Sequence, residues 1–312
     1  MRPYADQESM IADALLLSKA MSYKNALAGL AHGGGKAVIW GDPATDKSRD
    51  LFLAMGEFIS TLRGRYITAG DVGTTVDDLD IIRETNPWTT GRSPERGGSG
   101  DTGILTAFGI HQAMRAVAQH VWGEDSLENR VIGISGAGKV GGRLAVHLVE
   151  EGARVVITDP SPAAIQAVMS RVPVQVVAST QDLERMPLDI YSPNALGHAL
   201  TFEVAQALNC SAVCGAANNQ LASPEVAVLL AERGILYAPD YLVNCGGVVQ
   251  AAEEIPGFDM ERARNRVATV YDTTLSVLQR AQEDGVLPED AAAREAEERI
   301  AAGSGPFRRF DD

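Results

Sequence analysis

The chain has 312 residues, 45% of them hydrophobic, and its 41 acidic residues outnumber 27 basic ones, which gives a formal net charge of −14. This acidity argues against a nucleic acid or an anionic membrane as a partner, because both are bound by clustered Lys and Arg. Three cysteines are too few for a disulfide framework and lack zinc spacing, and no apolar run reaches the roughly 18 residues of a membrane span. We therefore expect a cytoplasmic protein of two domains without a bound metal.

A helical pattern begins the chain. Between Gln7 and about Gly29, apolar residues recur at steps of three and four, which predicts one helix with an inward face. The next position on that face is Lys24, and burying an ammonium is costly unless something pairs with it. The apolar members of the face are Met10, Ala14, Leu17 and Met21. Downstream, the sequence predicts strands Ala37–Trp40 and Tyr66–Gly70, helices Ser48–Arg65 and Val76–Glu84, a loop over Asn86–Gly100 and a helix over Gly103–Val121.

After Asn129 the pattern changes to short apolar strands separated by helical stretches. Such alternation predicts an α/β fold with a doubly wound parallel sheet of the Rossmann type. The chain then closes with a helix over Met260–Glu283, a shorter helix ending near Gly303 and a tail that we expect to be frayed. The predicted strands are Val131–Ser135, Arg154–Thr158, Val174–Ala178, Asp189–Ser192, Ala212–Cys214 and Ile235–Ala238.

A glycine-rich motif directly follows the strand Val131–Ser135 and opens a helix. It consists of Gly136, Ala137, Gly138, Lys139, Val140 and Gly141. In this context the glycines permit a tight turn, and the free N–H groups of the helix start bind a pyrophosphate. Asp159 ends the next strand, about 20 residues on, where an acid meets the ribose hydroxyls and favours NAD over NADP. The alternative is a structural turn with a surface Asp.

Two further segments hold candidates for proton transfer. His32–Lys36 places three glycines beside Lys36, which leaves bare backbone for a small substrate, and a lysine in a dry site carries protons near neutrality. Asp71 ends the predicted strand before Gly73, a position suited to proton transfer. The alternatives are a flexible turn with a solvated Lys and an ordinary turn residue. The neighbouring Asp77, Asp78 and Asp80 are expected on a solvated helix start.

Two loops dense in amides and glycines follow later strands, at Cys214–Gln220 and Pro239–Val248. Loops at the carboxyl ends of parallel strands bind ligands, and amides donate hydrogen bonds without adding charge. Each loop alone could also be an ordinary turn. The five histidines form no ligand spacing, and Cys245 is expected to be a small buried residue.

Read together, these residues resemble the Glu/Leu/Phe/Val amino-acid dehydrogenase family, and most closely the valine dehydrogenases of the actinobacterial type. The resemblance runs from Arg2 to about Gly303. It is carried by long segments such as MSYKNALAGLAHGGGKAVIWGDP, WTTGRSPERGGSGDTGILTAFG, VCGAANNQLASP and ILYAPDYLVNCGGVVQAAEE.

The resemblance implies a role for each candidate. Lys36 would be the catalytic lysine that activates water, Lys24 would bind the substrate carboxylate, and Asp71 would exchange protons with the substrate amine. Asn244, followed by Gly246 and Gly247, would lie beside the substrate and the nicotinamide. Residues that would line the side-chain pocket are Ala69, Val248 and Ala251, and residues that would contact the cofactor are Thr106, Asn194 and Asn218.

The implied reaction is the reversible, NAD-dependent oxidative deamination of valine, leucine or isoleucine to a 2-oxo acid and ammonia by a homo-oligomer. We expect a substrate domain over residues 1–100, an NAD-binding domain over 101–258, C-terminal helices over 259–303 that pack back between the two domains across a cleft, and a tail over 304–312. The alternatives are a phenylalanine or other specialised amino-acid dehydrogenase, and a non-catalytic NAD-binding paralogue. The non-catalytic paralogue is considered because family members begin with some forty further residues. We therefore expect either that the start of this chain was assigned too far downstream or that its first domain is truncated.

Overall fold

The computed structural model describes residues 1–303 of the chain, which fold into two compact units. The N-terminal unit comprises Met1–Thr102, Val248–Arg264 and the described part of Ala296–Asp312. The sheet unit comprises Gly103–Gly247 and Asn265–Glu295. The chain therefore passes from one unit to the other more than once, and segments distant in sequence complete each of them. The tail predicted for residues 304–312 lies outside the described residues.

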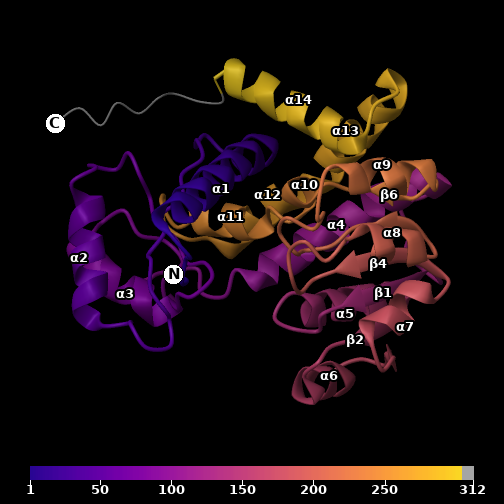
Figure 1. Cartoon of the computed structure of the whole chain (residues 1–312), viewed down its shortest axis with the longest axis horizontal. Coiled ribbons are helices and arrows are strands. Elements are labelled where there is room, and N and C mark those ends of the chain that lie inside the picture. The colour runs from indigo at the N-terminus through magenta and orange to yellow at the C-terminus, as the bar shows by residue number, and fades with distance from the viewer. Residues whose placement is uncertain (304–312) are drawn as a thin grey trace. The chain divides into compact units, whose positions relative to one another are not determined.

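The N-terminal unit is built mainly from helices. Its first helix is α1, Gln7–Leu27, which begins with a capping box between Asp6 and Ser9. Helices α2, Arg49–Ser60, and α3, Val76–Thr85, pack side by side around a core of Phe52, Leu79 and Ile82 (Figure 1). A short 3₁₀ turn, η1, covers Pro94–Arg96. The helices α11, Gly246–Ala252, α12, Met260–Ala268, and α14, Pro288–Ala301, each carry the chain across a unit boundary.

Two strands predicted for this unit are wrong. Within residues 1–102 the structure describes no strand, and each extended segment makes a single bridge, Arg2 with Trp40 and Thr68 with Thr89. One paired residue on each segment cannot build a ladder. The helix expected over Ser48–Arg65 ends at Ser60 because Arg63 and Gly64 take left-handed backbone conformations, with φ of 50° and 79°.

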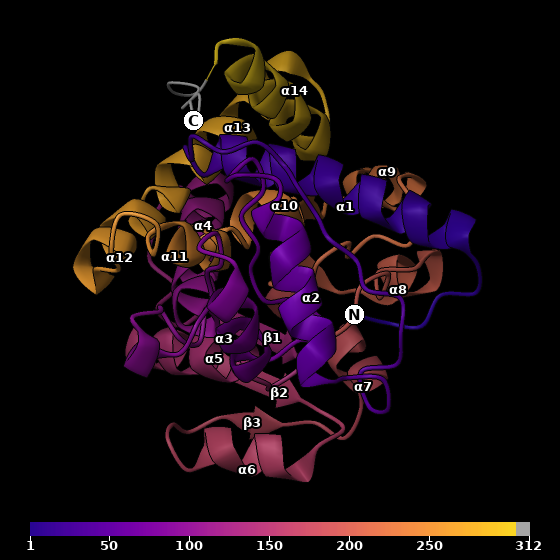
Figure 2. The ribbon, with the colours of Figure 1, turned by 90° about the vertical axis from the view of Figure 1, so that its left-hand side faces the viewer.

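The sheet unit holds six parallel strands in the order β3-β2-β1-β4-β5-β6. The predicted Rossmann-type sheet is thereby confirmed, because this order is that of the dinucleotide-binding fold. The strands are β1, Val131–Ser135, β2, Arg154–Thr158, β3, Gln175–Val176, β4, Leu188–Pro193, β5, Cys210–Val213, and β6, Leu236–Tyr237. Figure 2 shows the short edge strand β3 beside α6 at one end of this unit.

Helices cover the sheet in two groups. One group contains α4, Gly103–Trp122, α5, Gly141–Glu150, and α6, Pro162–Met169. The other contains α7, Thr180–Arg185, α8, Phe202–Ala207, and α9, Glu225–Glu232. Because parallel crossovers are right-handed and the strand order reverses direction at β1, the two groups lie on opposite faces. The short helix α10, Asp240–Val243, and the helix α13, Val270–Asp284, both pack against α4.

The single helix predicted over Met260–Glu283 is two helices, α12 and α13, which meet at Thr269. The Thr269 hydroxyl donates to the carbonyl of Arg266 at 2.8 Å, and a hydroxyl that bonds the local backbone in this way competes with the helical ladder. Among the described residues, no helix combines the length and the apolar character that a membrane span requires.

Candidate active site

The three glycines of the Gly136–Gly141 motif, in the loop after β1, lie in different surroundings. Gly136 has a φ of 100°, and a Cβ there would lie 2.9 Å from the Cβ of Ala195. A Cβ on Gly138 would meet nothing within 4 Å, whereas one on Gly141 would lie 1.9 Å from the carbonyl oxygen of Gly136. A tight turn, an open approach and a close helix contact are the three features that a dinucleotide pyrophosphate requires. The residues of this loop therefore fit a dinucleotide.

Asp159 lies beside the same loop. One carboxyl oxygen accepts the Ala137 N–H at 2.7 Å and the other accepts the Ser161 N–H at 2.8 Å. The residue that caps α5, Val140, makes no side-chain hydrogen bond to the first turn of that helix. The helix start thus presents backbone N–H groups next to a carboxyl that is fixed in place, as a bound pyrophosphate and ribose would require.

A row of amides joins the loops at the carboxyl ends of β4, β5 and β6. Asn194 follows β4, and its side-chain oxygen accepts the Ala216 N–H at 3.1 Å. Asn244 follows α10 and donates to the Ala216 carbonyl at 3.1 Å and to the Asn218 side-chain oxygen at 2.8 Å. The side-chain oxygen of the buried Asn244 has no hydrogen-bond partner among the described residues. The sequence placed these amides in separate loops, and the structure brings them together.

Thr106 joins this group from α4. A Cβ on Gly246 would lie 2.1 Å from the carbonyl oxygen of Leu105 and 2.9 Å from the Cα of Thr106. The glycine two residues after Asn244 thus permits α4 to approach the amide row. Thr106, Asn194, Asn218 and Asn244 consequently gather at one edge of the sheet, which is where ligands bind in folds of this class.

The glycine-rich segment before Lys36 is pressed against other parts of the N-terminal unit. A Cβ on Gly34 would lie 2.2 Å from the Ser18 carbonyl oxygen of α1, so only glycine fits there. The buried Asn25 donates from its side chain to the Gly33 carbonyl at 2.6 Å. These contacts with α1 disfavour the alternative of a flexible turn. Sequence analysis missed Asn25, although an amide at the apolar end of a helix was a usable signal.

Lys36 forms an ion pair with Asp71. The pKa of the Lys36 ammonium is lowered from 10.5 to about 8, chiefly by burial and in addition by the charge of Lys24, while Asp13 acts in the opposite direction. The Asp71 side chain is 45% exposed, and water weakens the hold of such a carboxyl on the lysine charge. The arrangement can therefore pass a proton near neutral pH.

Lys24 lies on the predicted inward face of α1, and its side chain is half-buried. The positive charge of Lys24 contributes to the lowered pKa of Lys36. On the opposite side of α1, Leu15 and Leu16 are 66% and 69% exposed. The predicted inward stripe thus corresponds to the less exposed side of the helix, and it carries Lys24 to the neighbourhood of Lys36 and Asp71.

The remaining candidates of the N-terminal unit are small apolar residues. Ala69 is exposed and directly precedes the loop that holds Asp71. Val248 and Ala251 lie on α11, with Val248 half-buried and Ala251 buried. The assignment of these three residues to a substrate pocket stays a prediction.

The expectation that the acids of α3 lie on a solvated helix start is wrong for two of them. Asp78 and Asp80 are buried, and Asp77 alone is exposed. Burial raises the pKa of Asp78, but hydrogen bonds from Lys47 and Thr75 outweigh it and hold the pKa below its usual value. The acid therefore caps α3 and pairs with a lysine, which satisfies its buried oxygens.

The candidates form two sets, one in each unit. Lys24, Lys36, Asp71, Ala69, Val248 and Ala251 belong to the N-terminal unit, and the motif residues, Asp159 and the amides belong to the sheet unit. Over residues 1–303, no group of three or more His, Cys, Asp or Glu side chains could hold a metal ion.

Comparison with known proteins covers most of the chain. The family model for the Glu/Leu/Phe/Val dehydrogenase dimerisation domain matches residues 1–87, and the model for glutamate, leucine, phenylalanine and valine dehydrogenases matches residues 161–303. The valine dehydrogenase of Streptomyces albus is 55% identical over 301 residues, which are 96% of this chain and 83% of that protein. The leucine dehydrogenase of Bacillus cereus is 44% identical over 299 residues, which are 96% of this chain and 81% of that protein.

A solved structure supports the same family relationship. The crystal structure of L-tryptophan dehydrogenase from Nostoc punctiforme superposes with a TM-score of 0.85 at 36% sequence identity, covering 97% of this chain and 87% of that one. The resemblance noted in the sequence is confirmed by these matches and by the strand order of the sheet. The chain therefore belongs to the Glu/Leu/Phe/Val dehydrogenase family, whose members are NAD(P)-dependent amino-acid dehydrogenases.

Proposed function

We propose that the chain catalyses the reversible, NAD-dependent oxidative deamination of a branched-chain L-amino acid, namely valine, leucine or isoleucine. The products are the 2-oxo acid, ammonia, NADH and a proton. The proposal is supported by the names of the relatives described above, and by the pairing of a lysine of lowered pKa with a carboxyl. The observation that carries the proposal is the buried Lys36, whose pKa is lowered and whose ammonium pairs with Asp71.

In this proposal Lys24 binds the substrate carboxylate through its ammonium group. Neutral Lys36 accepts a proton from the water that attacks the α-carbon once that carbon has become an iminium, and it returns protons as the carbinolamine collapses. Asp71 exchanges a proton with the amine that leaves as ammonia. The burial of Lys36 supports this role, because a lysine with a pKa near 8 is neutral in a useful fraction of molecules at moderate pH.

The dinucleotide supplies the acceptor for the hydride that leaves the α-carbon. In the proposal the Gly136–Gly141 loop and the start of α5 bind the pyrophosphate, and Thr106, Asn194, Asn218 and Asn244 hold the rest of the cofactor and the substrate. We assign NAD rather than NADP because Asp159 would accept hydrogen bonds from the ribose hydroxyls and would repel a 2′-phosphate. The two hydrogen bonds that fix its carboxyl beside the loop support this preference.

The substrate side chain is assigned to a pocket lined by Ala69, Val248 and Ala251. One or two methylenes of room change selectivity by only about 1 to 3 kcal/mol, so the three branched-chain amino acids would overlap as substrates. Phenylalanine and tryptophan belong in the same assay, because a tryptophan dehydrogenase is among the similar structures.

We also propose that residues 1–100 form the substrate domain, that residues 101–258 bind NAD, and that the enzyme is a cytoplasmic homo-oligomer. The description of the matched segment 1–87 as a dimerisation domain supports the oligomer. So does α1, which leaves Ile11, Leu15 and Leu16 exposed within that segment, an apolar surface that a second copy of the chain would cover.

The test is NADH formation from valine, leucine, isoleucine, phenylalanine and tryptophan, together with the Lys36→Ala variant. The wild-type protein should reduce NAD with at least one branched-chain amino acid. Lys36→Ala should lose turnover by about 10³-fold or more while it still binds NAD, because the variant removes only the proton carrier. Turnover retained in Lys36→Ala would remove this residue from its role, and silence of the wild type on every substrate would overturn the function.

A further inference from the structure

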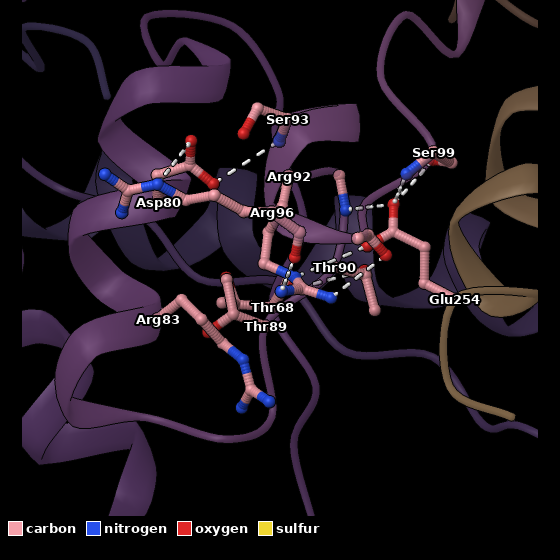
Figure 3. Close-up of polar contacts among 12 residues, drawn as sticks. Thr68, Asp80, Arg83, Thr89, Thr90, Arg92, Ser93, Arg96, Ser99 and Glu254 are labelled. Carbon is pink, nitrogen blue, oxygen red and sulfur yellow. Dashed lines mark hydrogen bonds and ion pairs between the residues drawn. The ribbon is translucent and has the colours of Figure 1, made fainter. Parts of the chain in front are cut away.

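Glu254 follows the end of α11 and has a fully buried side chain, 1% exposed. One carboxyl oxygen accepts three hydrogen bonds, from the Gly91 N–H at 2.8 Å, the Ser99 N–H at 2.8 Å and the Ser99 hydroxyl at 2.5 Å (Figure 3). The Glu254 backbone N–H donates to the carbonyl of Ala251 at 3.2 Å. A single residue thus connects α11 to the loop that contains Gly91 and Ser99.

The second carboxyl oxygen of Glu254 lies 3.7 Å from the Nε atom of Arg92 and has no hydrogen-bond partner among the described residues. The guanidinium of Arg92 donates to the carbonyl of Arg96 at 2.7 Å, and so closes the loop on itself. Gln250, one turn before Glu254, donates to the carbonyl of Ser99 at 2.9 Å. A buried acid with three donors and a nearby guanidinium is costly to assemble, which favours one fixed arrangement.

The other side of the same loop meets the segment that contains Ala69. The N–H and the hydroxyl of Thr90 both donate to the carbonyl of Thr68, at 2.8 and 3.1 Å, directly before Ala69. A Cβ on Gly91 would lie 3.4 Å from the backbone nitrogen of Gly70, directly after Ala69. Gly91, whose N–H binds Glu254, and its neighbour Thr90 therefore contact the backbone on either side of Ala69.

A continuous set of contacts thus runs from Ala69 through Thr90 and Gly91 to Glu254, and from there to Ala251. Both ends of this set are residues that the proposed function assigns to the side-chain pocket. We propose that Glu254 is a positioning residue that fixes the distance between Ala69 on one side and Ala251 on the other, and that it thereby sets the size of amino-acid side chain accepted. The inference rests on the proposed function, because it needs a substrate whose side chain contacts these residues.

The size of the expected effect follows from the sensitivity of such pockets. One methylene in an apolar pocket changes selectivity roughly 10- to 200-fold, so a small change in the spacing of the walls is measurable. Glu254 itself does not touch the substrate in this proposal. Its loss should therefore change the ratio of kcat/KM between a short and a long side chain, mainly through KM, rather than abolish turnover.

The test compares Glu254→Ala with a matched control, Glu253→Ala. Glu253 is the adjacent residue, is also buried and forms an ion pair with Arg262, which in turn donates to the Gly257 carbonyl at 2.6 Å. These contacts of Glu253 run to Arg262 and through it to Gly257, and not to Ala69 or the loop at Gly91. Loss of Glu253 should therefore lower stability without changing selectivity, which separates a positioning role from general destabilisation.

A third variant, Glu254→Gln, keeps an oxygen that can accept the three hydrogen bonds. The ratio of kcat/KM for valine to that for norleucine should change by about fivefold or more in Glu254→Ala, and should stay within about twofold of the wild type in Glu254→Gln and Glu253→Ala. An unchanged ratio in Glu254→Ala, or an equal change in Glu253→Ala, would overturn the inference while the wild-type turnover upholds the proposed function.

Absence of turnover in the wild type would instead overturn the proposed function and this inference with it. Should Glu254→Ala fail to fold, Ser99→Ala carries the test, because it removes only the hydroxyl donor and keeps the Ser99 N–H. In Ser99→Ala the ratio of kcat/KM for valine to that for a long side chain should change by about twofold or more. The direction of the change should be the same for every long side chain tested. An unchanged ratio in Ser99→Ala beside a folded, active protein would then contradict the inference.

Discussion

Burial and a second ammonium act on Lys36 in the same direction, and both favour its neutral form. The first prediction at the scale of single residues concerns pH. The rate of oxidative deamination at low substrate should rise with pH as Lys36 loses its proton, with a midpoint near the pKa of about 8. A pH profile of kcat/KM for valine measures this midpoint. A rate that is independent of pH between 7 and 9, or that falls there, would contradict a proton-accepting role for Lys36.

The second prediction concerns Lys24, whose charge lowers the pKa of Lys36. In Lys24→Met the midpoint of the pH profile should move to higher pH, because the neighbouring positive charge is gone. The KM for valine should also rise by about 10-fold or more, because the carboxylate loses a charged partner worth roughly 1.5 to 3 kcal/mol. Steady-state kinetics over pH give both values.

The matched control for Lys24→Met is Lys19→Met on the same helix. Lys19 is exposed, and its ammonium lies over the ring of Tyr23 at 5.5 Å, away from the catalytic candidates in the contacts that it makes. The Lys19→Met variant should leave both the KM for valine and the midpoint of the pH profile unchanged. Equal effects in the two variants would mean that general charge, rather than the position of Lys24, is responsible.

At this scale the sequence singled out unusual residues, but it did not predict their surroundings. Lys24, Lys36 and Asp71 stood out because a charged residue on an apolar face or beside glycines is unusual, and the structure brings the last two into contact. Glu254 was missed because its partners are backbone groups distant in sequence, which no local pattern reveals, whereas Asn25 was missed although it lies at the apolar end of a helix. The contact between Lys36 and Asp71 was not predictable from their spacing, and the resemblance implied only a separate role for each residue.

Among the elements, the loop between β1 and α5 makes the sharpest prediction, because two of its glycines lie in opposite environments. Gly138→Ala adds a methyl group to open space, so the protein should fold normally but bind NAD about 10-fold or more weakly. Gly141→Ala drives a methyl group to 1.9 Å from the Gly136 carbonyl oxygen, and the free energy of unfolding should fall by about 1 to 3 kcal/mol.

Thermal unfolding and calorimetric titration with NAD separate these two variants. The reverse pattern, with Gly138→Ala unstable and Gly141→Ala intact, would contradict the assignment of the loop. Normal NAD affinity in a folded Gly138→Ala protein would show that the dinucleotide does not approach the backbone at this glycine.

The elements of the sheet unit followed from the sequence, and those of the N-terminal unit followed only in part. The limits of β1 and β2 agree with prediction because each is a short apolar run bounded by polar or glycine residues and buried on both faces. The segments Ala37–Trp40 and Tyr66–Gly70 have the same local character, yet each pairs through a single residue. Whether an apolar run becomes a strand depends on a partner that local pattern does not contain.

For the whole molecule, we expect more than one chain in the assembly. The mass in solution should be a multiple of 33.1 kDa, because the exposed side chains of α1 are proposed to be covered by a second copy. Leu15→Asp should lower that mass by placing a charge in the apolar surface. Light scattering measures both, with Met169→Asp on α6, also exposed, as the control that leaves the mass unchanged. A monomeric wild type would contradict the oligomer.

The proposed hydride transfer can be followed by incubating the purified chain with NAD and L-valine deuterated at the α-carbon. We expect reduced cofactor that carries one deuterium, formed in equal amount with 2-oxoisovalerate and ammonia, and formation of all three products slowed by about 10³-fold or more in Lys36→Ala. Absence of reduced cofactor from a wild-type protein that binds NAD, or deuterium released to water rather than transferred to the cofactor, would contradict the proposed function.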